Sequence, residues 1–191
     1  MDANEMGKIT EVGGSVWTST PGYYVGSFPT GASGQLLMQK GIYCIGGDFD
    51  VNSTLNVTTD VNQNGTYEYI SEGVLIYLKT GGVHLNGSSL LDLHAIDDPS
   101  APLDIQNLLI FLPLGNTSTV KINGGSSSQF TGSIWAPSSL VTLNGSAGGT
   151  AVNSQVIGNS IEVAGNGTLS INYDENQNAV TMSPASIELN K

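Results

Sequence analysis

Short apolar and β-branched runs recur along most of the chain, and turns rich in Asn and Gly separate them. β-Branched residues favour strands, while Gly and Asn tolerate the positive φ that sharp corners require. The runs 42–45, 49–51 and 55–57 are predicted strands of this kind. The runs 74–79 and 108–112 are apolar on both faces, which is typical of a parallel sheet covered on both sides.

Similar strands recur with a period near 20 residues. Asn-Gly or Gly-Asn turns follow four of them, and the relevant glycines are Gly87, Gly124, Gly145 and Gly165. The last two steps are 21 and 20 residues, and the first step, of 37 residues, is interpreted as about two repeats. A second series of strands is centred on Ile76, Ile110, Ile134 and Ile157. Two series with a common period are the signature of a β-solenoid.

The predicted fold is therefore all-β, a right-handed parallel β-helix in which each strand pairs with the equivalent strand one coil away. An antiparallel sandwich is the alternative, because Asn-Gly pairs also close hairpins. The length suits one domain. Residues 41–191 are expected to form the β-helix. Residues 1–40 are expected to form an irregular N-terminal cap with a strand over 12–17 and a short helix around 35–39.

Charge narrows the range of partners. The chain of 191 residues has 16 acidic residues against five lysines, no arginine and a net charge of −11. Nucleic acids require basic side chains, so no nucleic-acid partner is expected, and anionic membrane surfaces are disfavoured too. No run approaches the ~20 apolar residues of a membrane span. Cys44 is the only cysteine, which excludes an internal disulfide.

One stretch resembles the first half of a calcium-binding loop. Asp60, Asn62 and Asn64 alternate in the pattern D-x-N-x-N-G, which places oxygen ligands around one cation. The full motif requires Glu at its twelfth position, but Ser71 stands there and Glu72 follows one residue late. Calcium is therefore a candidate cofactor, and a polar turn between two strands is the alternative.

Paired carboxylates are candidate catalytic groups, because glycoside hydrolysis uses two of them. Asp48 and Asp50 share one face of a strand, and Asp97 and Asp98 are adjacent. Solvated turn residues are the simpler interpretation, so no catalytic residue is assigned.

The two histidines offer a second possibility for chemistry. Asp92 lies near His94, and His84 with His94 would form a metal pair only with a third ligand. The simpler interpretation is two exposed strand histidines.

The order of segments resembles bacterial surface proteins associated with tight-adherence (Flp-type) pilus assembly. The matching pieces cover nearly the whole chain: YYVGSFP, KGIYCIGGDFDVN, GVLIYLKTGGVHLNGSSLLDL, LLIFLPLGNTSTVKINGGSSSQFTGSIWAPSSLVTLNG, SQVIGNSIEVAGNGTLSINYD and SPASIELNK. The resemblance implies an extracellular, cell-surface domain from which a hydrophobic anchoring helix has been removed, so that this fragment makes no membrane contact. Family members often carry a second cysteine before the YYVGSFP-like stretch, where 16–17 stand here, so Cys44 is expected to be a small buried residue.

The expected function is that of a non-catalytic structural or adhesive module of a cell-surface or pilus-associated protein. Its partners would be pilus or cell-envelope proteins or surface glycans, and its contacts would involve exposed aromatic residues. The candidates are Tyr23, Tyr24, Trp135 and Tyr173. A polysaccharide-binding or polysaccharide-cleaving β-helix protein is the alternative.

Overall fold

The computed structural model describes residues 6–28, 33–51, 54–86, 90–123, 128–145, 150–153, 155–165, 169–173 and 178–179. These residues are all-β and include no helix, so none is present that could span a membrane. The strands are β1 (Ile9–Gly13), β2 (Val16–Ser19), β3 (Gly22–Tyr24), β4 (Gly34–Met38), β5 (Gly41–Ile45), β6 (Phe49–Val51), β7 (Leu55–Thr58), β8 (Val74–Leu78), β9 (Val83–Leu85), β10 (Leu91–His94), β11 (Leu108–Phe111), β12 (Val120–Asn123), β13 (Ser128–Thr131), β14 (Ser133–Gly145), β15 (Thr150–Asn153), β16 (Val156–Gly165) and β17 (Leu169–Asn172).

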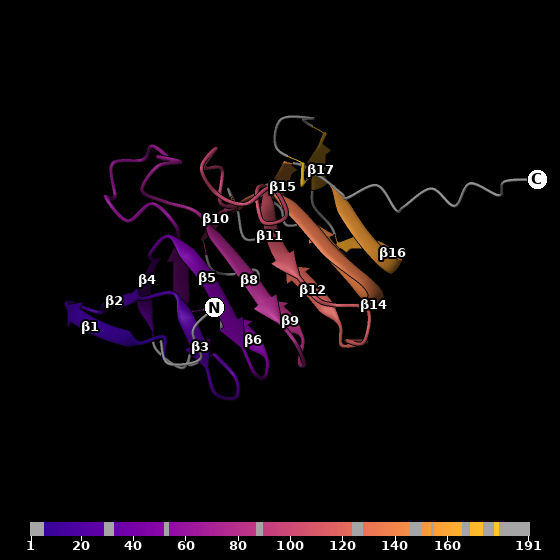
Figure 1. The fold of residues 1–191 in the computed structure, drawn as a ribbon, viewed down its shortest axis with the longest axis horizontal. Helices are drawn as coiled ribbons and strands as arrows, with labels where there is room; N and C mark the ends of the chain where they lie inside the picture. Colours follow the sequence, from indigo (N-terminus) through magenta and orange to yellow (C-terminus); the bar gives the residue numbers. More distant parts are fainter. Residues whose placement is uncertain are drawn as a thin grey trace, which may run out of the picture.

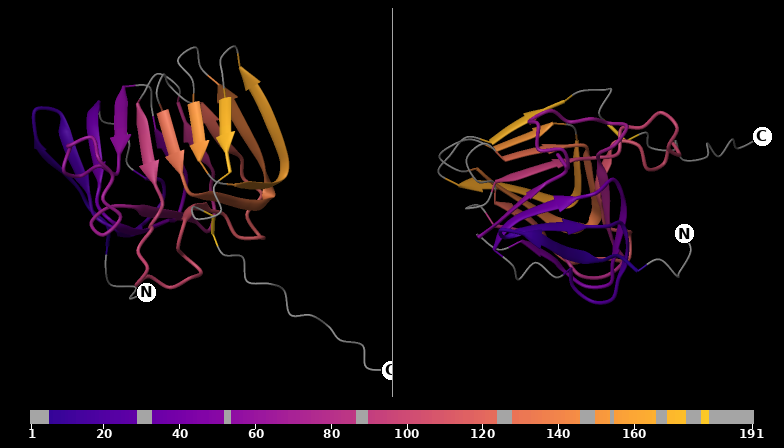
Figure 2. Two further views of the ribbon diagram at one scale, coloured as in Figure 1. Left: turned by 90° about the horizontal axis from the view of Figure 1, so that it is seen from above. Right: turned by 90° about the vertical axis from the view of Figure 1, so that its left-hand side faces the viewer.

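The strands form two curled sheets of almost entirely parallel strands. One sheet has the order β1-β2-β4-β7-β10-β13-β15-β17, and the other has the order β3-β5-β8-β11-β14-β12-β9-β6 with β16 against β14. Strand β14 is long enough to pair with β11 through its first part and with β12 through its last part. Neighbouring strands therefore advance along the long axis of the molecule (Figure 1), and end-on the sheets curl around a common interior (Figure 2).

Buried side chains in the interior form columns of paired residues. Ile76 pairs with Ile110, which pairs with Ile134, and all three are fully buried. This confirms three members of the predicted isoleucine series. The fourth is wrong by one position, because Ile134 pairs with Val156 and Ile157 pairs with Trp135. The repeat here is 22 residues long, as between Thr131 and Asn153, so the equivalent of Ile134 falls one residue earlier.

The long step between the first two predicted turns is a single repeat. Val83 pairs directly with Val120 and Leu85 pairs with Ile122, so no further strand of this series lies between β9 and β12. The interpretation of two repeats over these 37 residues is therefore wrong. The extra length is a loop over 95–107 between β10 and β11, which leaves the register unchanged.

The N-terminal part forms strands, contrary to two details of the prediction. The expected helix around 35–39 is strand β4, because Leu36 and Met38 alternate into the core and the strand pairs with β2 and β7. The expected strand over 12–17 is interrupted at Gly14 and Ser15, where φ is +61° and +64°, and the chain reverses from β1 into an antiparallel β2. An irregular cap over residues 1–40 is thus not seen among the described residues.

Candidate functional site

A row of outward-pointing side chains follows one face of the second sheet. Strand register joins Tyr23 to Cys44, Cys44 to Tyr77, Tyr77 to Phe111, Phe111 to Trp135 and Trp135 to Ile157. Successive side chains of a strand point to opposite faces. The residues on either side of Tyr77, Ile76 and Leu78, are completely buried, whereas Tyr77 is half-exposed. These six residues, called the outer row below, therefore face away from the core.

Two rings of the outer row, those of Tyr77 and Phe111, stack on one another. Tyr77 and Phe111 are paired across β8 and β11, with ring centroids 5.6 Å apart and planes inclined by only 19°. Both rings also line the groove described next.

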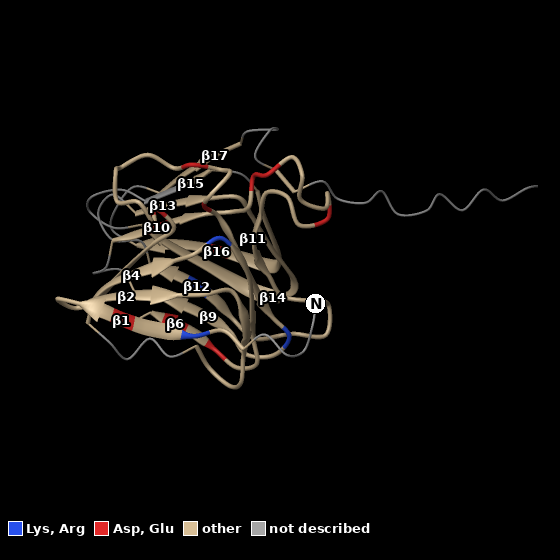
Figure 3. Ribbon diagram, turned by 60° about the vertical axis from the view of Figure 1, so that its left-hand side comes forward, with Lys and Arg blue, Asp and Glu red and all other residues tan. Residues whose placement is uncertain are grey.

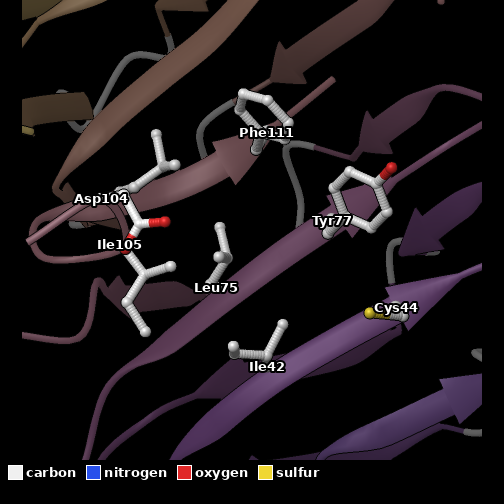
Figure 4. Close-up of a pocket in the computed structure, with 8 residues that line it drawn as sticks. Ile42, Cys44, Leu75, Tyr77, Asp104, Ile105 and Phe111 are labelled. Carbon is white, nitrogen blue, oxygen red and sulfur yellow. The ribbon is translucent and has the colours of Figure 1, made fainter. Parts of the chain in front are cut away.

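An apolar groove lies beside the outer row (Figure 4). It has a volume of about 500 Å³ and its lining residues come from β5, β8, β11 and the 95–107 loop: Ile42, Cys44, Leu75, Tyr77, Asp104, Ile105, Leu108 and Phe111. Leu75 and Leu108 belong to a second hydrophobic cluster outside the main core, and Ile96, from the loop, completes it. The loop therefore builds one wall of the groove, and the sheet builds its floor.

Hydrogen bonds fasten the loop to the sheet. Ser133 N–H donates to the Asn107 carbonyl over 2.7 Å, and Asn107 N–H donates to the Ile96 carbonyl over 2.9 Å. Gln106 Nε2 donates within the loop to the Ala101 carbonyl over 2.7 Å. Asn107 adopts a φ of +58°, which turns the chain into β11. The groove wall is thus held at both of its ends.

An ion pair adds a further tether. Lys40, which follows β4, pairs with the Asp98 carboxylate and donates to the Ile70 carbonyl over 3.0 Å. The hydrogen bond from Lys40, helped by donors from Ser100, holds the pKa of Asp98 well below its usual range. The pair joins the loop over 95–107 to the end of β4.

Cys44 lies in the floor of the groove and is half-buried. Burial raises the pKa of its thiol. The expectation of a small buried residue is met in part, because the thiol still borders the groove. As the only cysteine in the chain, it is also a natural reporter of whether the groove is filled.

The predicted calcium loop is a turn stabilised by its own side chains. Asp60 accepts hydrogen bonds from the backbone N–H of Gly65 over 2.8 Å and of Asn64 over 3.4 Å. The Asn64 amide oxygen accepts from Thr66 N–H over 2.8 Å. These contacts are those of a polar turn, the alternative to the calcium loop, and calcium binding stays a prediction.

Two glutamates complete this turn. The amide nitrogens of Asn62 and Asn64 donate to the two carboxylate oxygens of Glu68 over 3.2 and 3.0 Å. Glu72 is fully buried and accepts from Glu68 N–H over 2.7 Å. Asn62 and Asn64 thus direct nitrogen rather than oxygen toward the nearest carboxylate. Within the described residues, no group of three or more His, Cys, Asp or Glu side chains is placed to hold a metal ion.

The other acidic candidates are engaged separately. Asp48 accepts from Gly82 N–H over 2.7 Å, whereas Asp50 pairs with His84 over 2.6 Å. Asp98 is the partner of Lys40. Acidic positions are spread over different strands and loops (Figure 3).

The two histidines lie in different sheets, His84 on β9 and His94 on β10. The His84 side chain is 44% exposed, in agreement with the expectation. His94 is not, because its ring stacks on Tyr67 with centroids 4.2 Å apart while its Nε2 lies 3.0 Å from Asp92.

The four aromatic residues that were candidates for contacts lie in different parts of the structure. Tyr23 and Trp135 belong to the outer row. Tyr24 is instead buried, and its hydroxyl donates to the Thr20 carbonyl over 2.7 Å. Tyr173 is 73% exposed and follows β17. The groove was not anticipated, because it requires both the register of the sheet and the path of the loop over 95–107.

Comparison with known proteins adds a family. A family model described as "Domain of unknown function (DUF7305)" matches residues 24–180. No curated protein and no solved structure matches the chain.

Proposed function

The chain belongs to the DUF7305 family, and we propose that it is a non-catalytic structural and adhesive module of a bacterial cell-surface or pilus-associated protein. In this proposal the domain is extracellular and presents the outer row and its groove to an apolar segment of a pilus or cell-envelope protein. The resemblance of its segment order to tight-adherence surface proteins supports the location. The groove supports the mode of contact.

The same proposal includes the finer fold, a right-handed parallel β-helix. Its support is that parallel strands of each sheet are joined through strands of the other sheet, which is the connectivity of successive coils. Parallel crossover connections are right-handed in nearly all proteins. The antiparallel pair β1–β2 would then serve as the cap at the N-terminal end.

The single observation that carries the proposed contact is the combination of groove and outer row. A volume of about 500 Å³ is within the range of pockets that enclose a ligand, and seven of the eight lining residues are apolar, aromatic or Cys. Asp104 alone is charged. Recognition of an extended peptide through alternate side chains suits a surface of this shape.

A displayed library of random peptides is the probe that tests this contact. Selected peptides should carry neighbouring apolar residues and should slow alkylation of Cys44 when bound. Ile105→Asp, in the wall of the groove, should weaken their binding by about tenfold or more. Leu103→Asp is the matched control, because Leu103 lies in the same loop, is 66% exposed and does not line the groove. Equal binding to both variants would exclude the groove as the contact.

Polysaccharide binding or cleavage is the second candidate. It is favoured by Tyr23, the outermost aromatic of the row, which is 43% exposed and so leaves part of its ring accessible. A glycan array run beside a polysaccharide-cleavage screen separates the two functions. Glycan binding that Tyr23→Ala abolishes, while Ile105→Asp leaves it intact, would favour the second candidate over the first.

A further inference from the structure

Within the described residues, the last strand of each sheet at the C-terminal end has one edge without a strand partner. Among the described strands, β16 pairs only with β14, and β17 pairs only with β15. The opposite edges of β16 and β17 therefore present backbone N–H and C=O groups to the outside. Such edges readily accept another strand.

Three columns of core residues end in solvent at this same end. One runs from Val120 to Val141 to Ile161, and in it the first two residues are fully buried while Ile161 is 47% exposed. In each column the last residue is exposed because no further described strand lies beyond it to continue the buried core.

The two other columns end in the same way. Leu143 is fully buried and pairs with Val163, which is 61% exposed. Val152 is fully buried and pairs with Ile171, which is 48% exposed. The C-terminal end of the molecule thus exposes apolar side chains that continue the columns of its core.

The N-terminal end is covered differently. The antiparallel β1–β2 pair ends the first sheet there, and Ile9 of β1 packs against the main core. Phe28 closes the same region and is only 3% exposed. A head-to-tail contact between two molecules would place β1 against the free edge of β17, because these two strands end the first sheet. Four of the five residues of β1 are exposed, so this strand offers no apolar layer that could continue the core, whereas two C-terminal ends bring exposed core residues of both copies together.

The described strands at the free end carry little charge, although the whole chain has a net charge of −11. Strands β16 and β17 contain one ionisable side chain, Glu162. Two copies could therefore meet at this end without burying a set of like charges. Elsewhere on the surface the acidic excess would oppose self-association.

The last described residues of the chain, Asn178 and Ala179, lie away from this end. After β17 the chain reaches Asn178 and Ala179, and Ala179 N–H donates to the Ser133 hydroxyl over 2.8 Å. Ser133 begins β14, which is one strand further from the C-terminal end than β16. Ala179 packs against the second hydrophobic cluster, which includes Leu108. The chain has thus moved onto the outer face before residue 180.

We propose that the C-terminal end is an interface for a second copy of this chain. The two copies meet through the same surface, with β16 antiparallel to its counterpart and Ile161, Val163 and Ile171 buried between them. Because only the last strand of each sheet takes part, we expect the contact to be smaller than a standard stable interface. The dimer is accordingly weak, and it forms as the protein concentration rises.

Sedimentation equilibrium over about 1 μM to about 1 mM protein tests the proposal, because this range brackets weak association. The mass should rise from 19.8 kDa toward twice that value. Val163→Lys should remain monomeric throughout, with an unchanged melting temperature because the side chain is already 61% exposed. Val25→Lys is the control, since Val25 is 72% exposed and follows β3 at the opposite end, and it should dimerise like the wild type.

Three results would overturn the proposal. The first is a wild-type mass that stays at 19.8 kDa over the whole range. The second is a dimer that Val163→Lys does not weaken, which would place the contact elsewhere. The third is dimerisation that appears only after removal of residues 180–191, which would show that the chain's own last residues cover this end.

Discussion

The hydroxyl groups of Tyr43 and Ser19 meet inside the protein, 3.2 Å apart, and join strand β5 of one sheet to strand β2 of the other. Tyr43 is also within donating distance of two carbonyls, that of Ser19 at 2.9 Å and that of Gln39 at 2.8 Å. Both Tyr43 and Ser19 are completely buried. This polar contact therefore lies at the centre of an otherwise apolar interior.

Removal of this hydroxyl should weaken the protein. Tyr43→Phe leaves buried partners without a hydrogen bond, so we expect the free energy of unfolding to fall by about 1–3 kcal/mol. Tyr23→Phe is the matched control, because the same atom is removed from a ring that is 43% exposed, and its effect should stay within ~0.5 kcal/mol. Urea unfolding measures both. Equal effects would mean that the contact between Tyr43 and Ser19 contributes nothing specific.

Alkaline pH should destabilise the folded state relative to the unfolded chain. Burial raises the pKa of Tyr24 to about 12, and burial also raises the pKa of Tyr43 and of Tyr67. In the unfolded chain tyrosines lose their protons near pH 10. Unfolding therefore releases protons above that pH, and stability should be complete below about pH 10 and fall as the pH rises toward 12. Melting temperatures measured from pH 8 to 12 check this, and a flat profile above pH 10 would contradict it.

Gly81 should tolerate no side chain. Its φ is +81°, and a Cβ atom would lie 2.3 Å from the carbonyl carbon and oxygen of Gly47. Gly26 has nearly the same φ, +78°, but nothing within 4 Å of the Cβ position. Gly26→Ala therefore costs only the backbone strain of about 1 kcal/mol, whereas Gly81→Ala should cost clearly more. Thermal melting of the two variants separates strain from steric overlap, and equal losses would show that the backbone at Gly47 moves aside freely.

Cys44 should react slowly with alkylating reagents. The thiolate is the reactive form, and burial raises the pKa of this thiol, so less thiolate is present at any given pH. We expect its reaction with iodoacetamide to be slower than that of the unfolded chain and its pH–rate profile to be shifted upward. Val25→Cys in a Cys44→Ser background supplies an exposed comparison, because Val25 is 72% exposed. Similar rates for the two thiols would show that the floor of the groove is open to solvent.

Calcium should leave the melting temperature unchanged. The Asp60 carboxylate and the Asn64 amide oxygen already accept backbone hydrogen bonds within their own turn. Asp60→Ala should therefore lower stability by about 1 kcal/mol, equally with calcium and with chelator. A rise in melting temperature with calcium that Asp60→Ala abolishes would instead identify this turn as a cation site.

Much of the strand pattern is predictable from the sequence, because buried strands carry their signal locally. The strands over Ile42, Val74 and Leu108 were expected from apolar runs, and they lie close to the predicted positions. The stacking of Ile76 on Ile110 follows from the repeat. The local signal was misleading at Leu36, where an apolar spacing that suits a helix is also satisfied by a strand paired on both sides.

The site was harder to predict, for a physical reason. Tyr77 and Phe111 are 34 positions apart in the chain, and only the pairing of β8 with β11 places one ring on the other. The loop over 95–107 lengthens the repeat between Tyr77 and Phe111 but not the repeat between Phe111 and Trp135. The spacing in the sequence therefore does not reveal which residues pair. Ile105 therefore carries no signal in the sequence, although it forms part of the groove wall.

The pairing of strands also determines how the molecule would respond to a mechanical load. In the parallel part of the structure, each strand bonds to the strands immediately before and after it in the stack, as β13 does with β10 and β15. A force applied between the first and last strands would therefore load these ladders in series. The domain should extend in discrete steps, each of which releases one repeat, such as the 22 residues between Thr131 and Asn153. A chain extends by at most ~3.6 Å per residue, so each step of this kind would lengthen the protein by roughly 80 Å.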